Sequence, residues 1–295
     1  MKVFITGHMG FIGSHLTKRL DAEGIEWVGF DLKKHDDIRN EIGLDQAMRS
    51  CAGGVVIHLA ALAGVRDGEQ RPGEYLSTNV VGTQNVINSV KNHRMAHLIS
   101  FSSSSVLGLN TPPAEGNTEG EATKPIAVYG LSKECAEKLV QHAKLPSSII
   151  RPFTVYGENG RPNQVIYKWI NCIKAGQKIP FFGDGNTKRG YTYVGDLVDG
   201  LVKMVREIEK GGLYHEKFPV QVYNMGGAEI ITLNDLLELF KEVAGDFEID
   251  RMELPKGDVP ENWANCTKAR NAFGFDNKTK FREKVTEIIK TEMGI

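Results

Sequence analysis

The chain has 295 residues, enough for one large α/β domain or two smaller ones with complete hydrophobic cores. Its 36 Lys and Arg residues nearly balance 37 Asp and Glu residues, so the formal net charge is -1. That balance lacks the basic signature of a nucleic-acid-binding protein. We therefore expect small molecules, and not nucleic acids, as its partners.

Cysteine usage and hydropathy narrow the class of protein further. The cysteines Cys51, Cys135, Cys172 and Cys266 are widely spaced and form no CxxC pair or metal-ligand pattern, which predicts reduced thiols and no bound metal. No apolar run approaches the ~18 residues of a membrane-spanning helix, and glycines interrupt the N-terminal segment too early for a signal peptide. These features predict a soluble, cytoplasmic protein with no membrane partner.

Short β-branched runs alternate with amphipathic stretches through the first half of the chain. We expect strands at 2–6, 27–31, 53–61, 96–103 and 147–152, and helices at 15–24, 71–93 and 128–144. Such alternation is typical of βαβ units, and it predicts an α/β fold with a doubly wound parallel sheet of the Rossmann type. Further helices at 165–176, 194–209 and 232–244, with a strand at 220–225, predict a smaller C-terminal α/β cap over the carboxyl edge of the sheet.

The first predicted turn, in TGHMGFIGSHL, contains Gly7, Gly10 and Gly13 between a strand and a helix. Glycines there permit a tight turn and let a pyrophosphate approach the helix N-terminus. The spacing is GxxGxxG and not GxGxxG, so a purely structural turn is the alternative. Asp31 ends the next strand, 18 residues after Gly13, close to the ~20 expected of an acid that binds an adenosine ribose. A carboxylate there favours NAD over NADP.

In VYGLSKECAEK, Tyr129 and Lys133 stand at i and i+4, on one face of the predicted helix. Tyrosine has a reference pKa of about 10, and a nearby ammonium favours its phenolate. Tyr129 is therefore a candidate general base. A helix surface pair is the alternative interpretation, and the glycine turn and a serine run weigh against it.

Taken together, these segments resemble the extended short-chain dehydrogenase/reductases that act on nucleotide sugars. The resemblance covers nearly the whole chain, through TGHMGFIGSHL, HLAALAGV, STNVVGTQNV, FSSSSVLG, YGLSK, RPFTVYGENGRP, KRGYTYVGDL and GDVPENWANCTKARNAFGF. It implies bound NAD and a UDP-sugar substrate. It also implies an NAD-binding domain of residues 1–155 and 191–224 and a nucleotide-sugar-binding domain of residues 156–190 and 225–295.

The resemblance implies roles for individual residues around the cofactor. The pyrophosphate would be held by Gly7, Gly10, Phe11, Ile12 and Gly13, the adenosine ribose by Asp31, and the adenine by Asp37 and Ile38. Leu59, Ala60 and Ala61 would line the cofactor, and Lys133 would meet the nicotinamide ribose beside Tyr129.

The serine run FSSSSVLG distinguishes reaction types within that family. By resemblance, Ser103 shares the sugar O4 proton with Tyr129. At the next two positions 4,6-dehydratases carry Asp and Glu, and UDP-glucuronate decarboxylases carry Glu at the second. Ser104 and Ser105 cannot act as acid and base at neutral pH, which disfavours elimination. The pattern favours 4-epimerisation, in which C4 is oxidised to a ketone and reduced again from its opposite face.

The sugar is indicated by resemblance to UDP-glucuronate 4-epimerases at Arg66, Thr154 and Arg161. Thr154, Ser104 and Ser105 can surround a C6 carboxylate with neutral hydrogen-bond donors, but the same hydroxyls suit a C6 hydroxymethyl group. The alternative functions therefore include a 4-epimerase of UDP-glucose (or UDP-galactose) or of UDP-N-acetylglucosamine. They also include a UDP-glucuronate decarboxylase, a 4-keto-sugar reductase and a non-catalytic NAD-binding sensor.

The same resemblance assigns the substrate diphosphate to Arg189, and Lys256 stands where some relatives have a second arginine. Three residues depart from the family pattern: Leu107 stands where Tyr is usual, and Gly190 and Gly195 stand where acids are common. Relatives form dimers, so we expect a homodimer built on the helices at 71–93 and 127–143.

Overall fold

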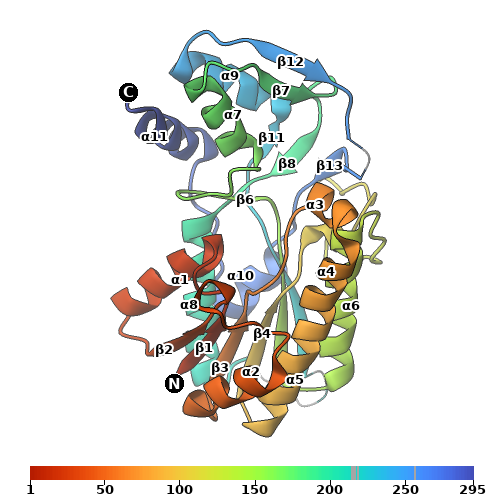
Figure 1. The fold of residues 1–295 in the computed structure, drawn as a ribbon, viewed down its shortest axis with the longest axis vertical. Helices are drawn as coiled ribbons and strands as arrows, with labels where there is room; N and C mark the ends of the chain where they lie inside the picture. Colours follow the sequence, from red (N-terminus) through yellow and green to blue (C-terminus); the bar gives the residue numbers. More distant parts are fainter. Residues whose placement is uncertain (214–216, 218, 256) are drawn as a thin grey trace.

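A computed structural model, which describes residues 1–213, 217, 219–255 and 257–295, shows a parallel α/β sheet with a smaller cap above it (Figure 1). Lys256 lies outside the described residues. In the described part of the chain, six parallel strands pair in the order β10-β5-β4-β3-β1-β2. They are β1 (Val3–Thr6), β2 (Trp27–Phe30), β3 (Val55–His58), β4 (His97–Phe101), β5 (Ser147–Pro152) and β10 (Val220–Met225). The predicted doubly wound parallel sheet is confirmed.

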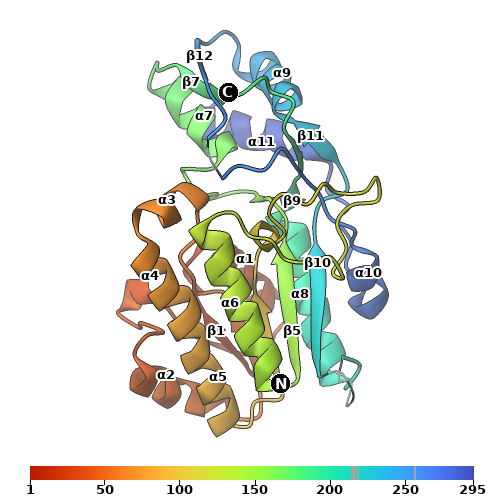
Figure 2. The same ribbon diagram turned by 90° about the vertical axis from the view of Figure 1, so that its right-hand side faces the viewer.

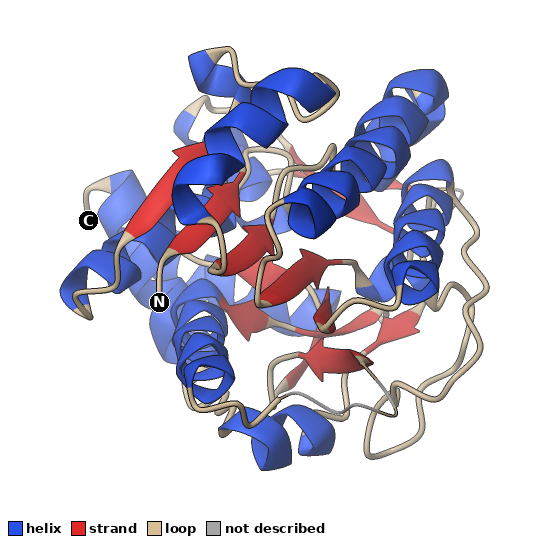
Figure 3. Cartoon of the chain, turned by 90° about the horizontal axis from the view of Figure 1, so that it is seen from below, coloured by secondary structure: helices blue, strands red, loops and turns tan. Residues whose placement is uncertain are grey.

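Successive strand residues pack against opposite helical layers because side chains alternate across a strand. Ile5 contributes to a core cluster with Leu16, whereas the neighbouring Phe4 shares a different cluster with Leu44 and Val86. Figure 3 shows the strands lying between the two helical layers. One layer has α1 (Phe11–Ala22), α8 (Val194–Glu209) and α10 (Thr267–Phe273), and the other has α2 (Glu41–Met48), α4 (Pro72–Leu76), α5 (Gly82–Asn92) and α6 (Val128–Ala143).

The helix expected at 71–93 runs continuously through α4, a π-helical turn, η3 (Ser77–Val81), and α5. Asn79 lies in that turn and is 1% exposed. Its side chain bonds both backbone groups of Leu62 and the hydroxyl of Ser132 on α6. The π turn thus ties the loop after β3 to α6, and π turns are frequent near functional sites.

The cap has its own aromatic core, which includes Trp169, Phe181, Phe240 and Phe281. Its helices are α7 (Val165–Lys174), α9 (Leu233–Ala244) and α11 (Phe281–Met293), and its strands are β7 (Ile179–Phe182), β8 (Lys188–Gly190), β11 (Ile230–Thr232), β12 (Ile249–Met252) and β13 (Glu261–Asn262). Figure 2 shows this layer above the carboxyl ends of the central strands. The helices predicted at 165–176 and 232–244 are α7 and α9 of the cap, and Thr232 caps α9 through a capping box with Asp235. The helix predicted at 194–209 and the strand predicted at 220–225 are α8 and β10, which belong to the sheet domain and not to the cap, because β10 pairs with β5 and α8 packs against α1.

Shorter elements connect these parts. They are α3 (Val65–Gln70), β6 (Val155–Tyr156), β9 (Thr192–Tyr193) and the 3₁₀ turns η1 (Leu32–Lys34), η2 (Arg49–Cys51) and η4 (Ser104–Val106). None of the described helices has both the length and the apolar character needed to span a bilayer. The described His, Cys, Asp and Glu side chains form no group of three or more suited to a metal ion.

The residues that depart from the family pattern have packing explanations. A Cβ added to Gly190 would lie 2.9 Å from the Cβ of Trp263, and one on Gly195 would lie 2.3 Å from the ring of Tyr193. Leu107 is 2% exposed and shares a small cluster with Phe153. Aromatic side chains therefore occupy the space that larger residues at 190 and 195 would need.

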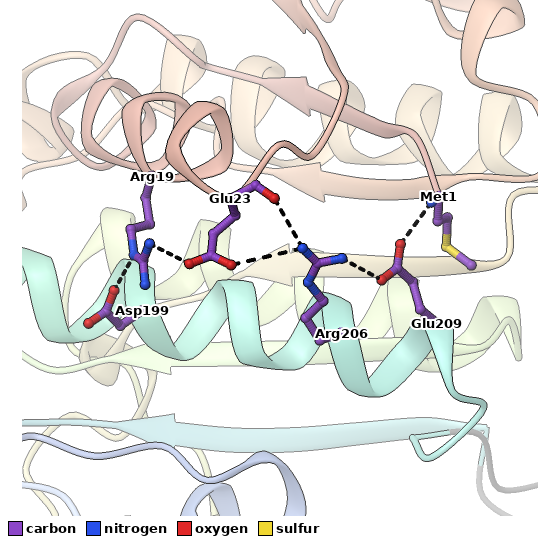
Figure 4. Close-up of polar contacts among 6 residues, drawn as sticks. All are labelled: Met1, Arg19, Glu23, Asp199, Arg206 and Glu209. Carbon is purple, nitrogen blue, oxygen red and sulfur yellow. Dashed lines mark hydrogen bonds and ion pairs between the residues drawn. The ribbon is translucent and has the colours of Figure 1, made fainter.

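A row of alternating charges joins α1 to α8 at the molecular surface (Figure 4). Arg19 pairs with Asp199 and Glu23 at 2.6 Å each, and Arg206 donates to the Glu23 carbonyl at 3.1 Å. Glu209 closes the row by binding Arg206 at 3.2 Å and the Met1 amine at 2.7 Å. Exposed pairs of this kind contribute roughly 0–1 kcal/mol each, so apolar burial supplies most of the stability of this contact.

Candidate active site

A cavity of about 530 Å³ lies where the carboxyl ends of β1, β3, β4 and β5 meet the cap. Its walls include the glycine turn and the serine run from the sheet side, and Arg161, Arg189 and Asn262 from the cap side. A second cavity of about 750 Å³ adjoins it and shares Thr154, Arg161 and Arg189. The sheet and the cap therefore form the site together.

The first cavity brings together most of the residues predicted from the sequence. They are Gly7, Gly10, Phe11, Ile12, Gly13, Leu59, Ala61, Ser103, Ser104, Ser105, Tyr129, Lys133, Thr154, Arg161 and Arg189. Arg66 lines the second cavity, whereas Asp31, Asp37, Ile38 and Ala60 line neither.

The geometry of the glycine turn suits a dinucleotide. Gly7 has φ +76°, and a Cβ there would lie 2.7 Å from the backbone nitrogen of Ala60. A Cβ on Gly13 would lie 2.2 Å from the Gly7 carbonyl oxygen, so α1 packs closely against the turn. Gly10 caps α1 without a side-chain hydrogen bond, and the first turn of the helix has no acidic residue. The free N–H groups and the helix dipole can therefore receive a pyrophosphate.

Asp31 is buried beside this turn, and backbone groups fix its carboxylate. Oδ2 accepts from the Met9 N–H at 2.8 Å and Oδ1 from the Lys33 N–H at 2.9 Å. A carboxylate oxygen has a second lone pair, which is free in this geometry to accept from a ribose hydroxyl. The arrangement fits NAD, whose ribose has hydroxyls and no 2′-phosphate.

The two residues predicted to meet the adenine differ in what they present. The Asp37 carboxylate is held by Arg39, and this contact lowers its pKa. The Ile38 side chain is buried against Gly82, so any contact of Ile38 with an adenine must use its backbone.

Lys133 lies at the base of the cavity and is almost fully buried. Burial lowers the pKa of its ammonium to about 8, and the charge of Glu137 opposes that shift. His58 from β3 is buried as well, and burial lowers its pKa to about 3, so its ring is neutral. A cationic Lys133 next to Tyr129 on one helix face can support a phenolate there.

Ser103 lines the cavity together with Tyr129, as does Ser102, whose hydroxyl donates to Glu137. The Ser103 Oγ accepts from the Ser105 N–H at 3.1 Å, which leaves the hydroxyl hydrogen free to donate. The 3₁₀ turn η4 places Ser104 and Ser105 next to it on the same wall. The last three serines of the run therefore line the cavity without an intervening carboxylate.

Arg161 and Arg189 supply positive charge from the cap. Nη1 of Arg161 is buried and has no hydrogen-bond partner among the described residues. Arg189 donates to the carbonyls of Lys188, Val259 and Pro260, and burial lowers the pKa of its guanidinium. Because a guanidinium has five N–H donors, Arg189 can hold this backbone and still reach an anion.

The sequence analysis missed Asn262 and the buried pair of Glu137 and Arg151. Nδ2 of Asn262, on β13, donates to the Ser104 Oγ at 2.9 Å. The segment GDVPENWANC belonged to the family resemblance, yet nothing local marked Asn262 as facing the serines. Glu137 stands at i+4 from Lys133, so helical periodicity offered a signal for that residue.

Comparison with known proteins is consistent with this geometry. The model of the NAD dependent epimerase/dehydratase family matches residues 3–226. A probable UDP-glucuronate 4-epimerase of Rhizobium meliloti (strain 1021) is 31% identical, over 98% of this chain and 96% of the relative.

Solved structures are similar over the whole length. MoeE5 in complex with UDP-glucuronic acid and NAD superposes with a TM-score of 0.90 at 27% identity, covering 100% of both chains. UDP-glucuronic acid 4-epimerase from Bacillus cereus, in complex with UDP-glucuronic acid and NAD, has a TM-score of 0.85 at 26% identity, covering 99% of both chains.

Replacing Asp31 with Ser tests its assignment to the cofactor ribose. Removing the acceptor oxygens should weaken NAD binding by roughly 10- to 100-fold and reduce the difference between the affinities for NAD and NADP. Calorimetric titration of cofactor-free protein with each dinucleotide measures this, with Asp36→Ser as the matched control. An unchanged affinity for NAD in Asp31→Ser would remove Asp31 from the cofactor site.

Proposed function

The chain belongs to the NAD-dependent epimerase/dehydratase family, and we propose that it is a 4-epimerase that interconverts UDP-glucuronate and UDP-galacturonate. The observation that carries the proposal is the cavity wall, where Ser103, Ser104 and Ser105 lie with Tyr129 and no acid replaces the second and third hydroxyls. Among the described lining residues, the carboxylates are Asp67, bound to Arg71, and Asp258, paired with Arg66 at 3.6 Å. The wall therefore supports proton exchange at O4 but not acid-base elimination at C5 and C6.

Three residues of the site take part in moving one proton to and from O4 of the sugar. The glycine turn of Gly7, Gly10 and Gly13 would hold NAD, which would supply reversible hydride transfer at C4. The Tyr129 phenolate takes the proton of the 4-hydroxyl, while the Ser103 hydroxyl donates to the same oxygen. The Lys133 ammonium stabilises the phenolate electrostatically. After the ketone turns its opposite face to the cofactor, the Tyr129 hydroxyl returns the proton to O4, so the net reaction inverts C4 only.

Nη1 of Arg161, which has no hydrogen-bond partner among the residues that the structure describes, favours a carboxylate at C6. A buried donor without an acceptor costs roughly 1–3 kcal/mol, and a bound carboxylate would remove that cost. Thr154 lines the same part of the cavity and adds a neutral hydroxyl. Holding the carboxylate through several donors also restrains the 4-keto intermediate, a β-keto acid, from losing carbon dioxide.

UDP-glucose is the second candidate substrate, because the hydroxyls of Ser104 and Ser105 can bind a C6 hydroxymethyl group equally well. Such a substrate would leave Arg161 without an anion. The choice of UDP-glucuronate as the substrate therefore depends on Arg161. The choice of 4-epimerisation as the reaction depends on the serines.

The second cavity suits the nucleotide part of the substrate. Phe182 lines it with an aromatic ring, and Arg66 lies over that ring at 4.4 Å. Arg189 lines both cavities, which supports its assignment to the diphosphate that joins the sugar to the nucleoside. These features support residues 1–155 and 191–224 as the cofactor domain and 156–190 and 225–295 as the nucleotide-sugar domain.

Nuclear magnetic resonance of separate incubations with UDP-glucuronate, UDP-glucose and UDP-N-acetylglucosamine tests the reaction. We expect UDP-galacturonate from the first, with no net change in NAD. Tyr129→Phe should lose about 10²–10⁴-fold in rate because the base is gone. Release of carbon dioxide would reassign the chain to a decarboxylase, and stoichiometric cofactor turnover to a reductase.

Arg161→Met tests recognition of the carboxylate. The variant keeps much of the side-chain volume but lacks the charge, so kcat/KM for UDP-glucuronate should fall by roughly 10- to 100-fold. The value for UDP-glucose should change much less. Equal losses for both substrates would place the effect of Arg161 outside recognition of C6.

We also propose that the chain acts as a cytoplasmic homodimer. Helices α5 and α6 pack side by side, and Val81 and Leu131 on this layer are 52% and 45% exposed. A second copy would cover these apolar side chains as a four-helix contact. Sedimentation of the intact chain should give a dimer and that of Leu131→Glu a monomer; a monomeric intact chain contradicts this proposal.

A further inference from the structure

Behind the active-site cavity, Glu137 of α6 and Arg151 of β5 form an ion pair whose side chains are 3% and 4% exposed. Nε of Arg151 donates to Oε1 at 2.8 Å and Nη2 donates to Oε2 at 2.7 Å, so the two planar groups meet through paired hydrogen bonds. The Ser102 hydroxyl donates to the same Oε1 at 2.5 Å. Three separate elements thus meet at one buried carboxylate.

Each of those elements carries part of the candidate site. Helix α6 carries Tyr129 and Lys133. Ser102 follows β4 and directly precedes Ser103, and β5 ends two residues before Thr154. A change at the Glu137 carboxylate would therefore alter the positions of the proposed base Tyr129, the Ser103 hydroxyl and Thr154 together.

Stability alone does not explain this arrangement. Taking each ion out of water costs several kcal/mol, and apolar replacements of buried ion pairs are often neutral or stabilising. Nη1 of Arg151 is also buried without a hydrogen-bond partner among the described residues, which adds to the cost. An ion pair retained at this depth is better explained by what its charge does for the neighbouring site.

Lys133 stands one helical turn before Glu137, on the same face of α6. Burial lowers the pKa of Lys133 to about 8, and the Glu137 charge acts in the opposite direction. His58 faces Lys133 from β3 as a neutral ring. The other titratable or charged side chains on elements packed against α6 are Asp67, Arg66, Glu69, Glu74, Tyr75, Lys91 and Arg151.

Several of these groups are bound elsewhere. Asp67 and Glu74 bind Arg71, and Glu69 accepts from the Val128 N–H. Arg151 donates two hydrogen bonds to Glu137 itself and is not among the charges that act on Lys133. The Glu137 carboxylate is thus the negative group whose charge acts on Lys133 from within the buried layer.

We propose that Glu137 is a positioning residue for the epimerisation: anchored by Arg151, its carboxylate aligns Ser103 with Tyr129 through Ser102 and supplies the fixed negative charge that keeps Lys133 an ammonium. The inference rests on the function proposed above. Neither Glu137 nor Arg151 is among the residues that line the two cavities, so they act through their neighbours.

Competitive labelling of Lys133 with acetic anhydride, followed by peptide mass spectrometry, tests the electrostatic part. Only the neutral amine reacts, and the measurement needs neither substrate nor turnover. We expect a midpoint near pH 8 in the intact chain. In Glu137→Gln the midpoint should fall by about one pH unit, because the opposing charge is removed.

Glu134→Gln is the matched control. It makes the same substitution at a similarly buried position of the same helix, but Glu134 binds Thr123 and Lys138, and its charge is not among the causes that shift the pKa of Lys133. Its midpoint should equal that of the intact chain. Equal midpoints in Glu137→Gln and the intact chain would overturn the proposal.

Kinetics test the alignment. In Glu137→Gln, kcat for UDP-glucuronate should fall about 10²-fold with KM little changed, and the alkaline limb of the pH–rate profile should follow the labelling midpoint. A double variant, Glu137→Met with Arg151→Met, removes both charges and can fold even if the single variant does not. The double variant should keep a low kcat and a lowered labelling midpoint of Lys133. Full activity in the double variant would overturn the proposal, because it would show that the ion pair only supports the fold.

The two measurements keep this inference separate from the proposed function. If the intact chain does not epimerise UDP-glucuronate, the proposed substrate or reaction is wrong. The labelling midpoints still decide whether Glu137 controls the charge of Lys133.

Discussion

The parallel course of the central strands is the constraint on which the rest of the structure depends. Because β1, β3, β4 and β5 run in one direction, their carboxyl ends meet at one edge, and the loops that follow them share one cavity. Gly7, Leu59, Ser103 and Thr154 each lie in such a loop. Reversing one strand would carry its loop to the far edge of the sheet and leave a gap in the wall.

The site contains several features that oppose stability. Helix α1 begins without a side-chain cap, Lys133 is almost fully buried, and Nη1 of Arg161 has no acceptor in the part of the chain that the structure describes. Each leaves donors or a cation without the partners that folding alone would favour. The helix N-terminus and Arg161 lie where a pyrophosphate and a carboxylate are expected, and Lys133 lies where a ribose is expected, so bound ligands would supply the missing partners.

The cap completes the site by holding the segment at residues 259–262 over the cavity. Arg189 binds the carbonyls of Val259 and Pro260, and β13 continues along β8. From this segment Asn262 reaches the Ser104 hydroxyl on the sheet side. The Ser104 oxygen is therefore oriented jointly by the 3₁₀ turn and by the cap, which links the geometry of the serine wall to the seating of the cap.

Local patterns in the sequence were enough to predict the parallel sheet, the glycine turn, the pairing of Tyr129 with Lys133 and the serine run, because each depends on residues close together in the chain. The family resemblance extended this to Thr154, Arg161 and Arg189. The tertiary structure alone decided that Asn262 meets Ser104, 158 positions away, that Arg151 binds Glu137, and that the short cap strands pair as they do. Such contacts join residues that are far apart in the sequence, and neither the helical nor the strand repeat relates them. They are therefore set only by the packing of the folded chain.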